Sequence, residues 1–162
     1  MKVLVLGVGN PTLGDDSLGL YVARGLKEKI SGKKLKIEVD IEESSLDWLT
    51  IAEKMIGYDE AILIDTLVVV EERLEGKIFK FDLKGSDDRH KRSYTLHNLG
   101  LPSALEIIRN ISPEETPKKI IAILVGIRKP KEYSDKLSPI IKRAAPMIIK
   151  EVLDEISKSN KQ

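Results

Sequence analysis

Three uninterrupted apolar runs constrain the fold of this 162-residue chain more than any other feature. They are KVLVLG at 2–7, AILID at 61–65 and IIAILVG at 120–126. A strand that is covered on both faces is apolar throughout, and such strands are typical of a parallel sheet between two layers of helices. The runs therefore predict a parallel sheet at the centre of the molecule.

The other segments predict what surrounds that sheet. Residues 36–41 and 76–83 alternate polar and apolar side chains, and we expect the second of these strands to be antiparallel or at an edge. Apolar residues at helical spacing predict helices over 16–30, 46–56, 102–111 and from 139 onward. Strands and helices thus alternate, which predicts an α/β fold: a three-layer α/β/α sandwich around a mostly parallel, twisted sheet of about five strands.

The length and the end of the chain indicate a single domain. We expect one domain over 1–157 and a frayed tail over 158–162. In the last helix, Ser138 and Pro139 suit the cap and the first position, and Pro146 is expected to kink the helix near Lys142.

Composition excludes several classes of function. Lys and Arg number 27 against 26 Asp and Glu, so there is no basic excess for nucleic acid. The absence of cysteine excludes disulfides, cysteine-ligated metals and a cysteine nucleophile. No apolar run reaches the roughly 18 residues that cross a membrane, and no signal peptide begins the chain, so we expect a cytoplasmic protein. Abundant Lys and Ile with few Gln and Asn favour a thermophilic source.

Candidate functional residues follow the predicted strands. Ligands of such sheets bind beyond the carboxyl ends of the strands, where Asn10, Asp15, Asp16, Asp65 and His97 are expected. Two carboxylates and an imidazole suit a divalent metal such as nickel, zinc or manganese. Plainer roles are open as well: either early aspartate can cap the first helix, Asp65 can cap a turn, and the histidine can be solvated.

Other motifs are incomplete. Gly7 and Gly9 begin a dinucleotide-binding pattern, but Thr12 replaces its third glycine, which leaves a nucleotide-binding module as a weak alternative. Ser17 lacks the glycine of a nucleophile elbow, and no H-E-x-x-H pair exists. The basic segments 84–92 and 128–136 are most simply solvated surface, although they can also gate a peptide groove.

Four blocks together resemble the hydrogenase maturation endopeptidases, which trim the C-terminus of nickel-iron hydrogenase large subunits. They are GVGNPTLGDDSLG at 7–19, AILIDT at 61–66, TLHNLGLPSAL at 95–105 and ILVGIRKP at 123–130. The resemblance runs in order over nearly the whole chain, and the first block is the most specific.

The resemblance implies an endopeptidase that removes the C-terminal extension of a nickel-loaded large-subunit precursor. It implies that Asp16, Asp65 and His97 contact the nickel, which the substrate supplies and for which another divalent metal can substitute. Asp16 and Asp15 are then the catalytic candidates, with Asp15 orienting the turn or assisting as a base. Asn10 would hold the loop or bind the substrate backbone. A non-enzymatic, nickel-sensing chaperone of the same large subunit needs the same residues and remains the alternative.

The sequence departs from the family pattern in three places. Ser17 replaces the glycine of D-D-G, and the segment IRKP carries an extra residue. Glu42-Glu43-Ser44-Ser45 replaces the usual Gly-Thr turn after the second strand. This segment is expected to be a loop at the cleft, which makes Glu43 a candidate for substrate binding. These departures concern specificity more than chemistry.

Overall fold

Five strands form a single sheet in the order β2-β1-β3-β5-β4. Their bounds are Lys2–Val8 for β1, Glu38–Ser44 for β2, Glu60–Val68 for β3, Ile78–Asp82 for β4 and Lys119–Ile127 for β5. Strands β1, β2, β3 and β5 are parallel, and β4 is antiparallel to β5 at the edge, as predicted. The computed structural model describes residues 1–83 and 100–159.

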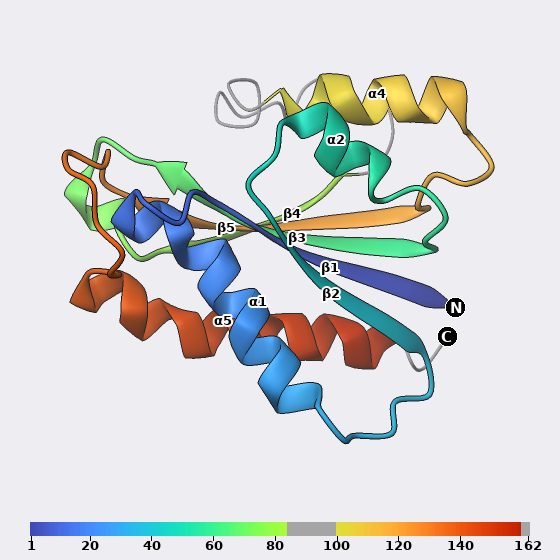
Figure 1. Cartoon of the computed structure of the whole chain (residues 1–162), viewed down its shortest axis with the longest axis horizontal. Coiled ribbons are helices and arrows are strands. Elements are labelled where there is room, and N and C mark those ends of the chain that lie inside the picture. Colours follow the sequence, from blue (N-terminus) through green and yellow to red (C-terminus); the bar gives the residue numbers. More distant parts are fainter. Residues whose placement is uncertain (84–99, 160–162) are drawn as a thin grey trace.

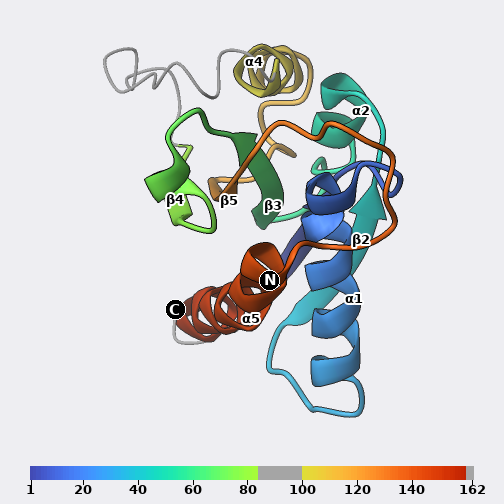
Figure 2. The same ribbon diagram turned by 90° about the vertical axis from the view of Figure 1, so that its left-hand side faces the viewer.

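Helices cover both faces of the sheet (Figures 1 and 2). They are α1 (Leu18–Ile30), α2 (Trp48–Glu53), α4 (Leu101–Ile111) and α5 (Pro139–Ser159), with short 3-10 turns η1 (Gly14–Ser17) and η2 (Glu72–Leu74). Helices α1 and α5 share one core with the sheet, and α2 and α4 share another. The predicted three-layer α/β fold is confirmed.

Strand β3 shows why the apolar runs are continuous. Ile62 and Ile64 point into the core beneath α1 and α5, whereas Ala61 and Leu63 point into the core beneath α2 and α4. Successive side chains of a strand face opposite sides, so a strand between two layers needs apolar residues at every position. Each large apolar side chain buried in this way contributes about 1.5–3 kcal/mol.

Two strands extend beyond their predicted ends. Strand β3 was expected to end at Asp65, but it continues to Val68 because Thr66, Leu67 and Val68 keep pairing with β5. Strand β2 reaches Ser44, so most of the expected loop 42–45 is strand, paired with β1 as far as Val8. In both cases a neighbouring strand supplies hydrogen bonds that the local sequence pattern does not reveal.

The helix ends also differ from expectation. The first helix was expected from residue 16, but η1 precedes α1 and ends at Ser17. Helix α5 includes Lys158 and Ser159, which were placed in a frayed tail. Lys158 pairs with Glu155 at 2.7 Å, and the Ser159 hydroxyl donates to Glu60 at 2.5 Å, so both residues are held. Residues 160–162 of that expected tail lie outside the described part of the chain.

None of the described helices combines the length and the apolar character needed to span a membrane.

The parallel strands all end at one edge of the sheet, which we call the carboxyl edge. It lies at the left of Figure 1, where the loop after β5 and η1 also lie.

Candidate functional site

The order of the strands creates an opening at the carboxyl edge, between β1 and β3. From β1 the chain continues to β2 on one side and then to β3 on the other, which is the switch point where ligands of such sheets bind. Pairing of β1 with β3 stops at Gly7 opposite Ile64, whereas β3 continues against β5. The residues of β3 just beyond Ile64 therefore lie beside a notch in the sheet.

The loop after β1 is pressed into this notch by close backbone contacts. A Cβ atom at Gly9 would lie 2.1 Å from the carbonyl oxygen of Asp16, so only glycine fits there. The Asn10 amide donates to that same carbonyl at 3.2 Å, and Asn10 Oδ1 accepts hydrogen bonds from the amide and hydroxyl of Thr12. Asn10 thus holds the loop, and packing inside the chain accounts for Gly9 without a bound nucleotide.

Thr66 contacts both Asp16 and Asp65. Its hydroxyl donates to Asp16 Oδ1 at 2.6 Å, and its backbone N–H hydrogen-bonds to the Asp65 carboxylate. Alternation along β3 explains this arrangement, because Asp65 then faces the layer of α2 and α4, and Thr66 faces the layer of α1 and α5. Asp16 lies in η1, which leads directly into α1, so it is on the side that Thr66 faces. The two carboxylates therefore lie on either side of the end of β3.

The environment of Asp65 favours its neutral form. The residue is only 5% exposed. Burial raises the pKa of the Asp65 carboxyl to about 7, the negative charge of Asp16 adds to the rise, and the hydrogen bond from Thr66 opposes it. A carboxyl with a pKa near neutrality can accept or release a proton at physiological pH, which is a frequent property of functional sites.

The two carboxylates are also chemically suited to a divalent cation, because a positive charge would stabilise the ionised form of Asp65, which burial and, to a smaller extent, the charge of Asp16 disfavour. Two carboxylates do not complete a ligand set. Within residues 1–83 and 100–159 no group of three potential metal ligands occurs. The third predicted ligand, His97, lies outside the described residues, so the predicted triad stays a prediction.

Asp15 accepts a hydrogen bond at the start of a different helix, α5. Its Oδ1 accepts a hydrogen bond from the backbone amide of Ser138 at 2.6 Å, at the start of α5. The expectation that Asp15 or Asp16 caps the first helix is wrong, since no side chain caps η1 or α1. Ser138 and Pro139 hold the cap and first positions that were predicted for them, since α5 begins at Pro139 and the Ser138 carbonyl accepts from the Lys142 amide at 2.9 Å. The buried Ser138 hydroxyl, however, has no partner among the described residues, so the side chain itself makes no cap hydrogen bond there.

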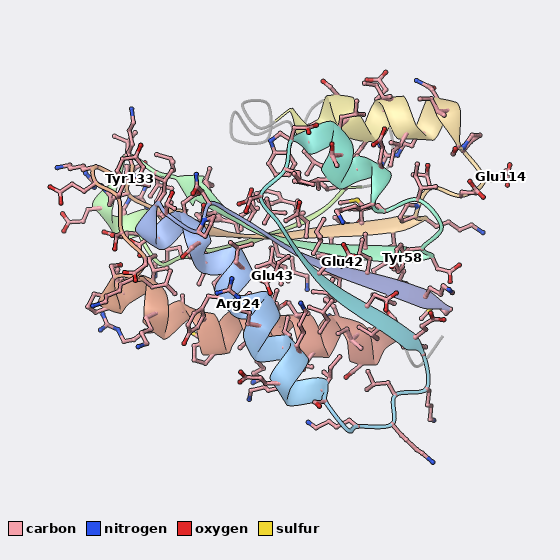
Figure 3. All side chains as sticks on the ribbon, viewed as in Figure 1. Arg24, Glu42, Glu43, Tyr58, Glu114 and Tyr133 are labelled. Carbon is pink, nitrogen blue, oxygen red and sulfur yellow. The ribbon has the colours of Figure 1, made fainter. Side chains whose placement is uncertain are left out.

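Glu43 lies on the outer strand of the sheet. Its carboxylate forms ion pairs with Arg24 at 2.8 Å and Lys27 at 3.4 Å, both on α1 (Figure 3). Its partner in the sheet is Gly7, so β1 separates it from β3. The structure therefore does not join Glu43 to the Asp16–Asp65 pair.

Sequence reasoning missed Thr66 as a site residue. A threonine at the end of an apolar strand is common, since its branched side chain suits a strand. The available signal was its polarity, because a buried hydroxyl needs a hydrogen-bond partner and the neighbouring Asp16 loop is the nearest source.

The class of scaffold is therefore an α/β sandwich whose switch point carries a buried carboxyl, Asp65, and a half-buried one, Asp16. No protein-family profile and no curated protein sequence matches the chain. Several solved structures, however, match the chain in fold. The hydrogenase maturating endopeptidase HybD from E. coli is 22% identical, with a TM-score of 0.72 over 98% of this chain and 94% of that one.

Two archaeal structures agree with this result. The [NiFe] hydrogenase maturation protease HybD from Thermococcus kodakarensis is 21% identical, with a TM-score of 0.69 over 96% of this chain and 99% of that one. The hydrogenase 2 maturation peptidase from a Thaumarchaeota archaeon is 25% identical, with a TM-score of 0.64 over 96% and 98%. The chain thus has the fold of hydrogenase maturation endopeptidases, in agreement with the resemblance of its sequence.

Proposed function

We propose that this protein is an endopeptidase that removes the C-terminal extension from a [NiFe]-hydrogenase large-subunit precursor. The observation that carries the proposal is the Asp16–Asp65 pair, held by Thr66 at the switch point of the sheet. The solved proteases support it, because their fold matches over nearly the full length of both chains. The partner is then the precursor itself.

The nickel of the precursor belongs to the proposed substrate rather than to the resting protein. Asp16, Asp65 and His97 would contact it, and carboxylate and imidazole donors suit nickel among other divalent metals. A divalent ion beside the scissile carbonyl supplies Lewis-acid polarisation or a more acidic water. Recognition of the metal would limit cleavage to precursors that have already received it.

The chain's own residues divide the remaining tasks. Asp16 is the catalytic candidate that the loop presents at the notch, and Thr66 orients its carboxylate. Asp15 orients the turn rather than acting as a base, because the start of α5 already engages one of its oxygens. Asn10 keeps the loop closed.

The test is processing of a nickel-loaded precursor in vitro, followed by mass spectrometry of the large subunit. We expect a shorter product with the wild-type protein and a loss of at least about 100-fold in rate for Asp16→Asn, Asp65→Asn and His97→Ala. Glu28→Gln removes an exposed carboxylate of α1 and serves as the matched control.

Circular dichroism and thermal unfolding would confirm that each variant folds. Normal processing by Asp16→Asn would refute the proposed role of the pair. Stable binding of the nickel-loaded precursor without any shortening would instead identify a nickel-sensing chaperone, because that function needs the same residues but no cleavage.

A further inference from the structure

A pocket lies next to the Asp16 loop, at the same edge of the sheet. It has a volume of about 290 Å³ and lies between the turn at Leu13–Asp15 and the loop that follows β5. We call residues 128–136 the basic loop. Four cations of this loop line the pocket: Arg128, Lys129, Lys131 and Lys136.

The basic loop is tied to the loop that carries Asp16. The Gly14 amide donates to the Ser134 carbonyl at 2.8 Å, and the Ser134 amide donates to the Thr12 carbonyl at 2.9 Å. Figure 3 shows Tyr133, in the middle of the basic loop, at the carboxyl edge of the molecule and at the opposite end from Glu114. These backbone bonds give the pocket a defined position relative to the Asp16–Asp65 pair.

The charges of the pocket are unbalanced. None of its four cations forms an ion pair with a residue of the described ranges 1–83 and 100–159. Two carboxylates, Glu132 and Asp15, also line it, so four positive charges stand against two negative ones. The pocket therefore has a positive excess and favours an anionic group.

We propose that this pocket binds a carboxylate of the extension that is cleaved from the substrate. Every such extension ends in an α-carboxylate, and an acidic side chain offers the same chemistry. A guanidinium and several ammonium groups around a small, open depression of the surface suit a carboxylate. The volume lies at the small end of ligand pockets, so it suits one residue rather than a long peptide. The identity of the ligand rests on the function proposed above.

Binding here has a direct consequence for cleavage. The backbone bonds between the loops hold the pocket and Asp16 in one assembly. A carboxylate held in the pocket would set which peptide bond lies over the Asp16–Asp65 pair. The basic loop would thus act on the affinity for the precursor more than on the chemical step.

The first experiment measures binding without cleavage or metal. The ¹⁵N-labelled protein is titrated with three acetylated pentapeptides: penta-alanine with a free carboxyl end, the same peptide as an amide, and an amide whose last residue is Glu. We expect the free acid, the Glu peptide or both to shift the backbone signals of 128–138, and the neutral amide not to. The two charged peptides distinguish an α-carboxylate from a side-chain carboxylate. Equal shifts with all three peptides would overturn the proposal.

The second experiment removes two positive charges of the basic loop and measures peptide binding and the KM for the precursor. The double variant Arg128→Gln/Lys131→Gln should weaken binding of the charged peptides and raise KM for the precursor about tenfold, with kcat within about twofold. The double variant Lys142→Gln/Arg143→Gln removes the same charge from exposed positions on α5 and is the matched control. An equal loss in both double variants would show only general attraction and would overturn the proposal.

The two experiments separate this inference from the proposed function. Peptide binding by a protein that does not shorten the precursor would refute the endopeptidase and leave a carboxylate site. Normal shortening, with KM unchanged in Arg128→Gln/Lys131→Gln, would refute the pocket and leave the endopeptidase.

Discussion

Charged residues at the two edges of the sheet differ in the partners that surround them. At the amino edge, Glu155 pairs with Lys80, Lys119 and Lys158, and Glu60 accepts from Lys119 and Ser159. At the carboxyl edge, Asp65 is buried beside another carboxylate. The cations of the basic loop have no described partner there. The buried carboxylates of the amino edge thus have partners within the described residues, whereas the carboxyl edge leaves both signs of charge for a ligand.

The pKa values of two buried carboxyls show this difference directly. Burial by itself raises the pKa of Glu155, but hydrogen bonds from Lys158 and Lys80 outweigh it, and the pKa lies below its ordinary value. Burial also raises the pKa of Asp65, and there the neighbouring charge of Asp16 increases the effect. Asp65 lies deep and has no cation beside it among the described residues, whereas Glu155 is held by lysines, so one site produces a titratable group and the other a structural anion.

The largest expected effect is a pH dependence that only the carboxyl edge produces. The Asp65 pKa rises from 3.8 to about 7 on folding, so its contribution to stability is fully present below pH 4 and is lost as the pH rises to 7. The loss corresponds to roughly 4 kcal/mol in the metal-free protein. Urea unfolding at pH 5 and pH 8 should show a smaller decrease for Asp65→Asn than for the wild type.

Asp16→Asn is the matching control for that measurement. Removing the charge of Asp16 should lower the pKa of Asp65 and reduce the decrease in part. A wild type and an Asp65→Asn variant with identical pH dependence would show that Asp65 is ionised in the folded protein.

The next effect tests the tight packing of the carboxyl edge. A Cβ at Gly19 would lie 2.1 Å from the carbonyl oxygen of Val8 and 2.5 Å from that of Ile64. Because both contacts are with backbone, Gly19→Ala should lower the free energy of unfolding by about 3 kcal/mol. At Gly25, in the same helix, a Cβ would meet only the movable tip of Ile149, so Gly25→Ala should cost much less. Equal costs in thermal unfolding would contradict this explanation.

The third prediction concerns the ion pairs of Glu155 at the amino edge. Glu155 is 4% exposed, and Glu155→Gln removes the anion shared by three lysines. The free energy of unfolding should fall by about 2 kcal/mol, while processing of the precursor stays unchanged. Glu151→Gln, which removes a more exposed partner of Lys80, should cost under about 1 kcal/mol. A loss of processing in Glu155→Gln would show that the two edges are coupled.

The smallest effect concerns the hydrogen bond between Thr66 and Asp16. Thr66→Val keeps the shape of the side chain and removes the donor to Asp16 Oδ1. Processing should slow about tenfold, which corresponds to roughly 1.4 kcal/mol. Thr66→Ser retains a hydroxyl and should restore most of the rate. A slow Thr66→Ser together with a normal Thr66→Val would rule out the hydrogen bond as the cause.

Local sequence patterns were sufficient where burial is uniform along an element. The continuous runs predicted the three central strands, and the alternation in 76–83 predicted an antiparallel edge strand. The same reasoning placed Asp16 and Asp65 after neighbouring strands, and the fold brings them to either side of Thr66. Patterns of this kind succeed because the period of a strand or helix depends only on nearby residues.

Partners that are distant in sequence explain what was missed. The extension of β3 to Val68 depends on β5, and the acceptor for the Ser138 amide at the start of α5 is Asp15, 123 residues earlier. Glu43 was expected at a cleft, but two cations of α1 hold it on the outer strand. No local pattern contains this information, because each outcome depends on which residues tertiary packing brings together.

The sequence by itself determined that this chain forms a covered parallel sheet with acidic residues at the ends of its strands. Alternating side-chain directions and the need to bury apolar surface follow from neighbouring residues alone. Only the tertiary structure decided that Asp16 and Asp65 both hydrogen-bond to Thr66 while Asp15 and Glu43 have other partners. A charged side chain acquires its role from the charges and the burial around it, and those depend on the completed fold.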